Sequence, residues 1–354
     1  MDIPSEAIAS TGGARNRNVP LWQRELSEAI TDPRQLLAAL GLPSTLAEPA
    51  RLASRDFGLR VTRSLLSRMR HGDPDDPVLR QVLPRGEELF EAEGFVPDPL
   101  KEAAARRAPQ LLHKYSGRAL IITTEACAVH CRYCFRREFP YSAGADQGAA
   151  GGGRFHAALA VIAGDPGIEE VILSGGDPLS LSDARLTQLT DAIVAIPHVR
   201  RIRVHTRQPV VLPSRVDEGL LAWLRGIRLP VVMVLHVNHA NEIDEDVRDA
   251  CASLRKAGAT LLNQSVLLRG VNDDVDTLQS LSRALADAGV MPYYLHLPDR
   301  VRGTAHFDVD EGRAQELVAA LSARLSGYLV PRLVREVPGA PSKTPVPSLV
   351  SRVE

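Results

Sequence analysis

The sequence predicts an α/β fold in which a partial (β/α)6 barrel follows a helical N-terminal extension. From about residue 118 onward, short apolar segments alternate with longer segments of helical spacing, a pattern typical of parallel strands joined by right-handed crossovers. Residues 1–100 instead show helical spacing interrupted by proline-rich breaks. Polar and cysteine residues gather where the expected strands end, which is where barrel enzymes carry their chemistry.

The N-terminal extension contains three segments of helical spacing, at residues 22–30, 34–40 and 59–69. Asp32-Pro33 is a helix-start signal between the first two. We therefore divide the chain into a helical extension (1–105), a barrel core (106–330) and a C-terminal segment (331–354).

The barrel core alternates between the two kinds of element. Strands are expected at residues 119–123, 170–173, 201–205, 230–235, 260–265 and 292–296. Helices are expected at residues 155–163, 184–196, 242–257, 276–288 and 310–325. The Ala- and Gly-rich residues 143–153 predict a flexible loop.

Bulk composition excludes several classes of partner. The net charge of −1 and the 24% charged residues give no reason to expect a nucleic acid or a membrane as partner. The first twenty residues have no apolar core of a signal peptide, and no apolar run reaches the length of a bilayer span. With four cysteines in a long chain, these features predict a cytoplasmic protein.

Cys127, Cys131 and Cys134 have the spacing C-x3-C-x2-C directly after the first expected strand. Three thiolates can hold a [4Fe-4S] cluster and leave one iron open to a ligand. Two other interpretations remain: a zinc site with His130 as fourth ligand, or unrelated thiols. Cys251 lies in a helical pattern and is expected to be a buried small residue.

Other candidate residues stand at the ends of expected strands or in the C-terminal segment. Gly175, Gly176 and Asp177 form a turn in which glycines would let a ligand approach the backbone. Lys343 is framed by Pro and Gly, which favours a positioned amine of the kind that forms Schiff bases. Arg136 is a candidate for binding a carboxylate, and Lys114 and Arg118 are candidates for binding a phosphate. The carboxylates Asp299 and Glu336 could pair with a cationic substrate.

At this point the chain resembles a known family. The cysteine spacing resembles that of the radical S-adenosylmethionine (SAM) enzymes. Together with Leu-Leu-His-Lys-Tyr (111–115), Ser-Gly-Gly-Asp-Pro-Leu (174–179), Leu-Asn-Gln-Ser-Val-Leu-Leu-Arg-Gly (262–270) and Pro-Ser-Lys-Thr-Pro (341–345), it is similar to the pyridoxal phosphate (PLP)-dependent lysine 2,3-aminomutases. The closest similarity is to the bacterial branch that makes (R)-β-lysine for modification of translation elongation factor P.

The resemblance implies a role for each candidate residue. Cys127, Cys131 and Cys134 would ligate the cluster, and Lys343 would form an aldimine with PLP. Gly175, Gly176, Asp177, His236 and Asn238 would bind SAM; Lys114, Arg118 and Gln264 would hold the PLP phosphate. Arg136 would bind the carboxylate of L-lysine, and Asp299 and Glu336 would receive its ε-ammonium. The implied fold is the radical SAM partial (β/α)6 barrel, and the implied electron donor is a flavodoxin or ferredoxin.

The chain departs from the clostridial members of this family in three places. Lys114 and Glu336 stand where those enzymes commonly have Arg and Asp. Eleven residues follow Lys343, whereas the clostridial enzymes continue into a segment used for assembly and zinc, so we expect no zinc here. Two rival functions are an aminomutase for glutamate or another amino acid, and a non-catalytic module that binds zinc or elongation factor P.

Overall fold

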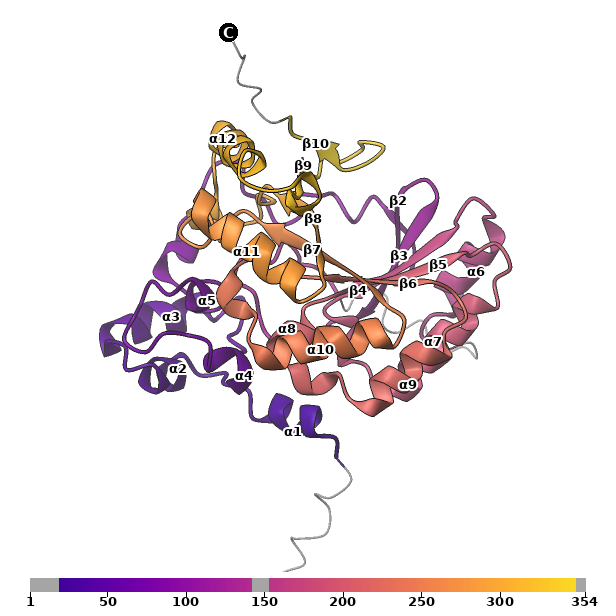
Figure 1. The fold of residues 1–354 in the computed structure, drawn as a ribbon, viewed down its shortest axis with the longest axis horizontal. Coiled ribbons are helices and arrows are strands. Elements are labelled where there is room, and N and C mark those ends of the chain that lie inside the picture. The colour runs from indigo at the N-terminus through magenta and orange to yellow at the C-terminus, as the bar shows by residue number, and fades with distance from the viewer. Residues whose placement is uncertain (1–18, 142–152, 348–354) are drawn as a thin grey trace, which may run out of the picture.

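The computed structural model describes residues 19–141 and 153–347 and consists of one ten-stranded sheet with helices packed against it (Figure 1). The loop predicted at residues 143–153 lies outside the described residues except for Gly153. The strands follow one another in sequence order across the sheet, from β1 to β10. Among the described residues, no helix combines the length and the apolar composition needed to cross a bilayer.

All six predicted strands are present, and they pair in parallel. They are β3 (Arg118–Thr124), β4 (Glu170–Gly175), β5 (Arg201–Thr206), β6 (Val231–Leu235), β7 (Thr260–Val266) and β8 (Met291–His296). A seventh parallel strand, β9 (Arg332–Arg335), continues the sheet beyond β8. The α/β barrel class predicted from the alternation is therefore confirmed.

Short antiparallel strands extend both edges and were not predicted. β1 (Arg106–Ala108) and β2 (Leu111–Tyr115) form a hairpin beside β3, and β10 (Thr344–Pro345) pairs with β9. Strands of two to five residues leave little periodic signal in the sequence. One consequence matters for the site: Lys114 lies on β2, and Lys343 immediately precedes β10.

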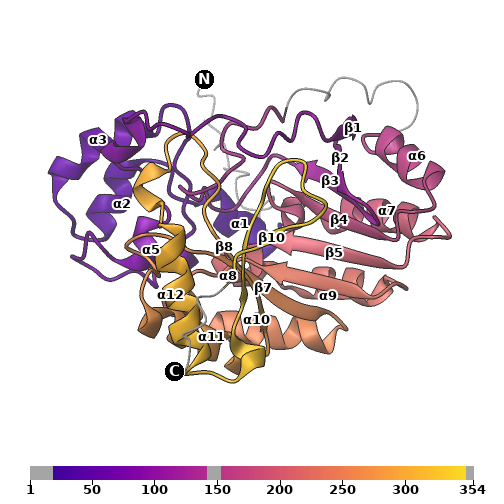
Figure 2. The same cartoon turned by 90° about the horizontal axis from the view of Figure 1, so that it is seen from above.

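The connecting helices lie on the outer face of the sheet (Figures 1 and 2). The predicted helices are found as α6 (His156–Gly164), α7 (Asp183–Val194), α10 (Glu245–Lys256), α11 (Val275–Asp287) and α12 (Glu311–Ser322). Between β5 and β6, the structure adds α8 (Gln208–Val211) and α9 (Glu218–Gly226), where no helix was expected. The Asp217 carboxylate caps α9 by accepting from the Leu220 amide at 2.9 Å.

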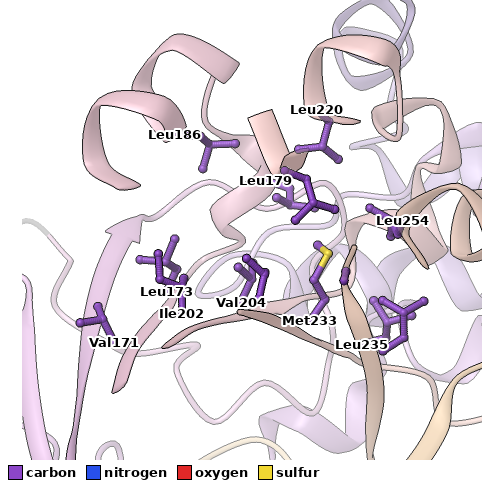
Figure 3. Close-up of a cluster of buried hydrophobic side chains, with 14 of the residues drawn as sticks. Val171, Leu173, Leu179, Leu186, Ile202, Val204, Leu220, Met233, Leu235 and Leu254 are labelled. Atoms are coloured by element: carbon purple, nitrogen blue, oxygen red, sulfur yellow. The ribbon is translucent and has the colours of Figure 1, made fainter. Parts of the chain in front are cut away.

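The largest hydrophobic core lies between the sheet and these helices (Figure 3). Alternate residues of β4, β5 and β6 meet leucines from the helical side: Val171, Leu173, Ile202, Val204, Met233 and Leu235 face Leu179, Leu186, Leu220 and Leu254. Cys251 of α10 belongs to the same core and is buried, as expected. Since this face of the strands is filled by the core, their other face is left to line a cavity.

The N-terminal extension packs against the barrel at the cysteine segment. Its helices are α1 (Leu21–Ser27), α2 (Pro33–Ala39), α3 (Ala47–Ala53), α4 (Arg63–Leu66) and α5 (Pro77–Arg80), of which α3 and α5 were not predicted. Their hydrophobic core includes Ala128 and Val129, which lie between the first two cysteines. The extension and the cysteine segment therefore share one core, although the division of the chain at residue 105 stays a proposal.

Candidate active site

One cavity of about 620 Å³ is lined by every site residue that the family resemblance implies. The cysteines, the candidate cofactor-binding residues, Arg136, Asp299, Glu336 and Lys343 all line it. This volume is typical of pockets for small ligands and cofactors. The structure thus brings together residues from position 114 to position 343, while their individual roles stay predictions.

The cysteine segment is held by the N-terminal extension. The Arg132 amide donates to the Gln81 carbonyl oxygen at 2.8 Å, and the His130 amide donates to the Arg60 carbonyl oxygen at 3.0 Å. The fully buried Arg132 guanidinium binds both oxygens of Glu88, at 2.9 and 2.6 Å. Because such bidentate pairs fix geometry as well as charge, the extension positions the loop that carries the three thiols.

His130 does not lie toward the thiols. Its Nδ1 is 2.9 Å from the Gly58 carbonyl oxygen, and its ring stacks on Phe57 with centroids 5.2 Å apart. The described residues hold no group of three or more His, Cys, Asp or Glu side chains that could bind a single metal ion. A [4Fe-4S] cluster does not require its ligands to meet at a single metal ion, since each thiolate binds a different iron.

Two of the three thiols lie where the thiolate form is disfavoured. Burial raises the pKa of Cys134 to about 11 and the pKa of Cys127 well above its ordinary value. Thiolates here therefore need compensating positive charge, which iron supplies when thiols become ligands. The Arg207 guanidinium also donates to the Cys131 sulfur at 2.8 Å.

The glycines at the end of β4 line the cavity and also allow a close approach between two chain segments. A Cβ on Gly175, which has φ of +120°, would lie 2.7 Å from the Thr124 carbonyl oxygen. A Cβ on Gly176 would lie 2.6 Å from the Glu125 carbonyl carbon. The space beside both glycines is thus filled by the chain leading to Cys127, so the lack of a side chain lets β4 approach the cysteine segment, and their predicted role in binding SAM stays a proposal.

Asp177 connects the ends of β4 and β5. Its carboxylate accepts from the Thr206 hydroxyl (2.7 Å) and from the amides of Leu179, Arg207 and Gln208 (2.8 to 3.1 Å). Burial nevertheless raises the pKa of Asp177 above its ordinary value. These bonds fix the strand ends, and the predicted contact of Asp177 with SAM stays a proposal.

Lys343, Glu336 and Lys114 form a continuous ion-paired group. Glu336 accepts from Lys343 Nζ and from Lys114 Nζ, each at 2.8 Å. Burial opposes ionisation of Glu336, yet the two ammonium groups hold its pKa well below the ordinary value. Glu336 follows β9 and Lys114 lies on β2, so this group links opposite sides of the open barrel.

Asp299 is the second carboxylate at this end of the cavity. Burial, reinforced by Glu336, raises the pKa of Asp299 to about 7, although Lys343 and Lys114 act in the opposite direction. Glu336 is therefore ionised, whereas Asp299 changes between its protonated and ionised forms near pH 7. A cationic group that enters beside them would be stabilised by the ionisation of Asp299.

Arg136 and Lys114 are both held by Glu102, a residue that the sequence did not single out. Glu102 accepts from Arg136 Nε (2.7 Å) and Nη2 (2.9 Å) and lies 3.0 Å from Lys114 Nζ. Burial alone would raise the pKa of Glu102, but Arg136 and Lys114 hold it below its ordinary value. Arg136 also donates to the Ser174 hydroxyl at 3.1 Å.

The remaining candidates lie along the strands. His236 Nε2 is 3.0 Å from Gln264 Nε2, and the Arg118 guanidinium lies 4.5 Å from the ring centroid of Tyr115. Asn238 donates to Gln81 and accepts from the Val266 amide. Burial lowers the pKa of His236 to about 3, which keeps its imidazole neutral at ordinary pH.

Sequence reasoning missed a buried polar network beside the cysteines. Arg207 donates to Gln81 and to Glu242, each at 2.7 Å, and Glu242 accepts from the Asn238 amide. Arg207 stands in the polar cluster at the end of β5 and could have been found by its strand-end position. Gln81, Glu88 and Glu102 belong to the extension and carry no comparable signal.

Comparison with known proteins places the chain among close relatives. It is 48% identical to an L-lysine 2,3-aminomutase of Escherichia coli K12, over 92% of this chain and 94% of that protein. Identity is 45% to the Haemophilus influenzae protein of the same name and 36% to that of Clostridium subterminale, with 94% and 77% of those proteins covered. In both comparisons nine-tenths of this chain is aligned, 91% and 92% respectively.

The chain belongs to the L-lysine 2,3-aminomutase family. It is therefore an isomerase of the intramolecular aminotransferase type, as the sequence motifs predicted. No family model matches the chain. Among solved structures, it aligns with a radical SAM methyltransferase of Sphaerobacter thermophilus at 18% identity and a TM-score of 0.42, covering 64% of this chain and 68% of that one.

Membership in the aminomutase family implies a [4Fe-4S] cluster, SAM and PLP, and the residues present fit these groups. Three thiols from one loop enter the cavity without converging on a single point. Lys343 presents an amine to the same cavity, with the cations Lys114 and Arg118 nearby for a phosphate. The buried Nε2 atoms of His205 and His296 have no hydrogen-bond partner among the described residues, which leaves polar groups available to a ligand.

Proposed function

We propose that the protein converts L-lysine into (R)-β-lysine by moving the amine from the α- to the β-carbon. The family supports the reaction, and the handedness of the product follows from the resemblance to the bacterial branch. The observation that carries the proposal is the single cavity in which a cysteine triad, a Lys343 amine and charged groups of both signs meet. A lysine substrate needs both signs, because it carries a carboxylate at one end and an ammonium at the other.

The cofactors would be held by separate parts of this cavity. Cys127, Cys131 and Cys134 would ligate the cluster, and Lys343 would bind PLP covalently, with its phosphate near Lys114, Arg118 and Gln264. Gly175, Gly176, Asp177, His236 and Asn238 would border SAM. When bound, the cluster and SAM supply reversible removal of a hydrogen atom, and PLP supplies the electrophilic group that carries the migrating amine.

The residues of the chain itself orient the substrate. Hydrogen bonds to Glu102 and Ser174 engage three of the five N–H groups of Arg136, which leaves one on each terminal nitrogen for a carboxylate. Asp299 and Glu336 would receive the ε-ammonium. Lys343 Nζ now contacts one Glu336 oxygen; if Lys343 held PLP, that oxygen would be available to the ammonium.

The proposed cellular role follows from the same resemblance. The product would serve the β-lysylation of elongation factor P by a lysyl ligase in the cytoplasm. A flavodoxin or ferredoxin would supply the electron that the cluster needs. The absence of zinc also stays a prediction, which metal analysis of the purified protein would check.

Anaerobic turnover tests the proposed reaction. Protein reconstituted with iron and sulfide is incubated with L-lysine, SAM, PLP and dithionite, and the product is assayed for β-lysine and its handedness. We expect (R)-β-lysine from the native chain and none from Cys131→Ala or Lys343→Ala. Intact cluster and PLP absorption without β-lysine would contradict lysine as substrate, and glutamate would be the next amino acid to assay.

A further inference from the structure

Glu102 lies at the centre of the charged groups that line the cavity, and the family resemblance gives it no role. Its side chain is 2% exposed, and its two oxygens contact Arg136 Nε, Arg136 Nη2 and Lys114 Nζ within 3.0 Å. It comes from the end of the N-terminal extension, directly before β1. A single carboxylate thus holds the proposed carboxylate-binding arginine and a proposed phosphate-binding lysine.

The backbone around Glu102 is arranged to direct this side chain inward. Lys101 has φ of +51°, a left-handed conformation that is uncommon for a residue other than glycine. The Asp98 carboxylate accepts from the amides of Glu102 (3.0 Å) and Ala103 (3.2 Å), which fixes the turn. Strained backbone that its surroundings hold in place is concentrated at functional sites.

The contact with Glu102 decides how Arg136 faces the cavity. Glu102 binds the Nε–Nη2 edge of the guanidinium as a bidentate pair, while Nη1 donates to Ser174 at the end of β4. The guanidinium plane is therefore fixed from two sides. The same Glu102 oxygen binds Arg136 and Lys114, so it also keeps two like charges close together that would otherwise repel each other.

We propose that Glu102 is a positioning residue that orients Arg136 toward the carboxylate of the amino-acid substrate and holds Lys114 against Glu336. This inference rests on the proposed function, because it assumes that Arg136 binds that carboxylate. Glu102 touches neither end of the substrate in this scheme. It acts through Arg136 and Lys114. Because Lys114 also contacts Glu336, Glu102 connects the arginine that would bind the carboxylate with the glutamate that would bind the ammonium.

The test is Glu102→Gln, which keeps the size of the side chain and removes its charge. We expect the KM for lysine to rise about tenfold or more, because a displaced arginine weakens substrate binding, while kcat changes by less than about threefold. Affinity for PLP, titrated by absorbance, is expected to stay equal or become tighter, since a negative charge near the phosphate site is lost. A disrupted fold would weaken the binding of both lysine and PLP.

Control variants separate the possible outcomes. Glu93→Gln removes an exposed carboxylate from the same extension and should leave the KM for lysine and the affinity for PLP unchanged. Glu102→Asp keeps the charge, and its KM should fall between those of the native and Gln proteins; it also serves as the test if the Gln protein fails to fold. If the binding of lysine and the binding of PLP were weakened to the same extent in both Glu102 variants, the inference would be overturned.

Arg136→Met distinguishes this inference from the proposed function on which it rests. A raised KM in Arg136→Met together with an unchanged KM in Glu102→Gln would refute the role of Glu102 alone. An unchanged KM in both variants would refute the carboxylate-binding role of Arg136 and, with it, the role of Glu102.

Discussion

At the scale of single residues, the site is built from charges that are already paired within the protein. Glu336 binds Lys343 and Lys114, and Glu102 binds Lys114 and Arg136. Buried charges that lack partners are costly, so this pairing keeps the cavity stable without a ligand. In the proposed function, substrate binding would be an exchange of partners, in which the ammonium of lysine would replace an ammonium of the protein beside Glu336.

Asp299 makes this exchange depend on pH. Its pKa of about 7 means that the carboxylate is mostly ionised above pH 7 and mostly protonated below it. In the proposed site the ammonium of lysine would pair with the ionised form, so we expect the KM for lysine to rise as pH falls, by up to about tenfold for each pH unit below 7. The groups that set this pKa are Glu336, Lys343, Lys114 and Glu102.

KM measured between about pH 6 and about pH 8.5 checks this prediction. In Asp299→Asn the KM should be high at every pH and should lose the slope below pH 7. A slope that persists unchanged in the Asn protein would assign the ionisation to another group.

At the scale of elements, the end of β4 packs closely against the backbone of the cysteine segment. The amides of Gly176 and Asp177 donate to carbonyl oxygens of Thr124 and Ala126 at 2.6 and 2.8 Å. The sequence indicated this turn by its two glycines but assigned them to ligand approach. The structure adds a second reason, the close approach of the loop that leads to Cys127, whose position could not be read from local sequence.

Gly176→Ala tests this contact. The added Cβ would lie 2.6 Å from the Glu125 carbonyl carbon, and we expect a loss of about 1–3 kcal/mol of stability together with less iron bound per chain. Gly226→Ala is the matched control, because nothing lies within 4 Å of a Cβ at that helical position. Its stability should stay equal or rise by up to about 1 kcal/mol. Equal iron content in the two proteins would contradict the prediction.

At the scale of the whole molecule, the N-terminal extension acts as a support for the cysteine segment. Glu88 of the extension pairs with Arg132 and also with Arg137 (2.8 Å), and all three side chains are buried. Gln81, which directly follows α5, contacts both the cysteine segment and the ends of β5 and β6. The extension is thus part of the site, and the barrel alone would lack these contacts.

Glu88→Ala should therefore be strongly destabilising. It leaves two buried guanidinium groups without their partner, which costs about 3–5 kcal/mol, and it should also reduce iron incorporation. Unfolding by urea and iron analysis provide the two measurements. Glu48→Ala, which breaks the exposed pair with Arg51, should leave the unfolding midpoint unchanged. Similar midpoints for both variants would show that the extension does not support the loop.

The sequence by itself determined the order of the six central parallel strands and the five helices predicted between and after them, the cysteine triad and the strand ends at which the site lies. These features are local, because periodicity and motif spacing depend on residues that are neighbours in the chain. Tertiary structure alone decided that Glu102 holds Arg136 across 34 residues and that Glu336 meets Lys114 across 222. Such pairs form only when folding brings distant segments together and burial removes the water that would otherwise solvate each charge separately.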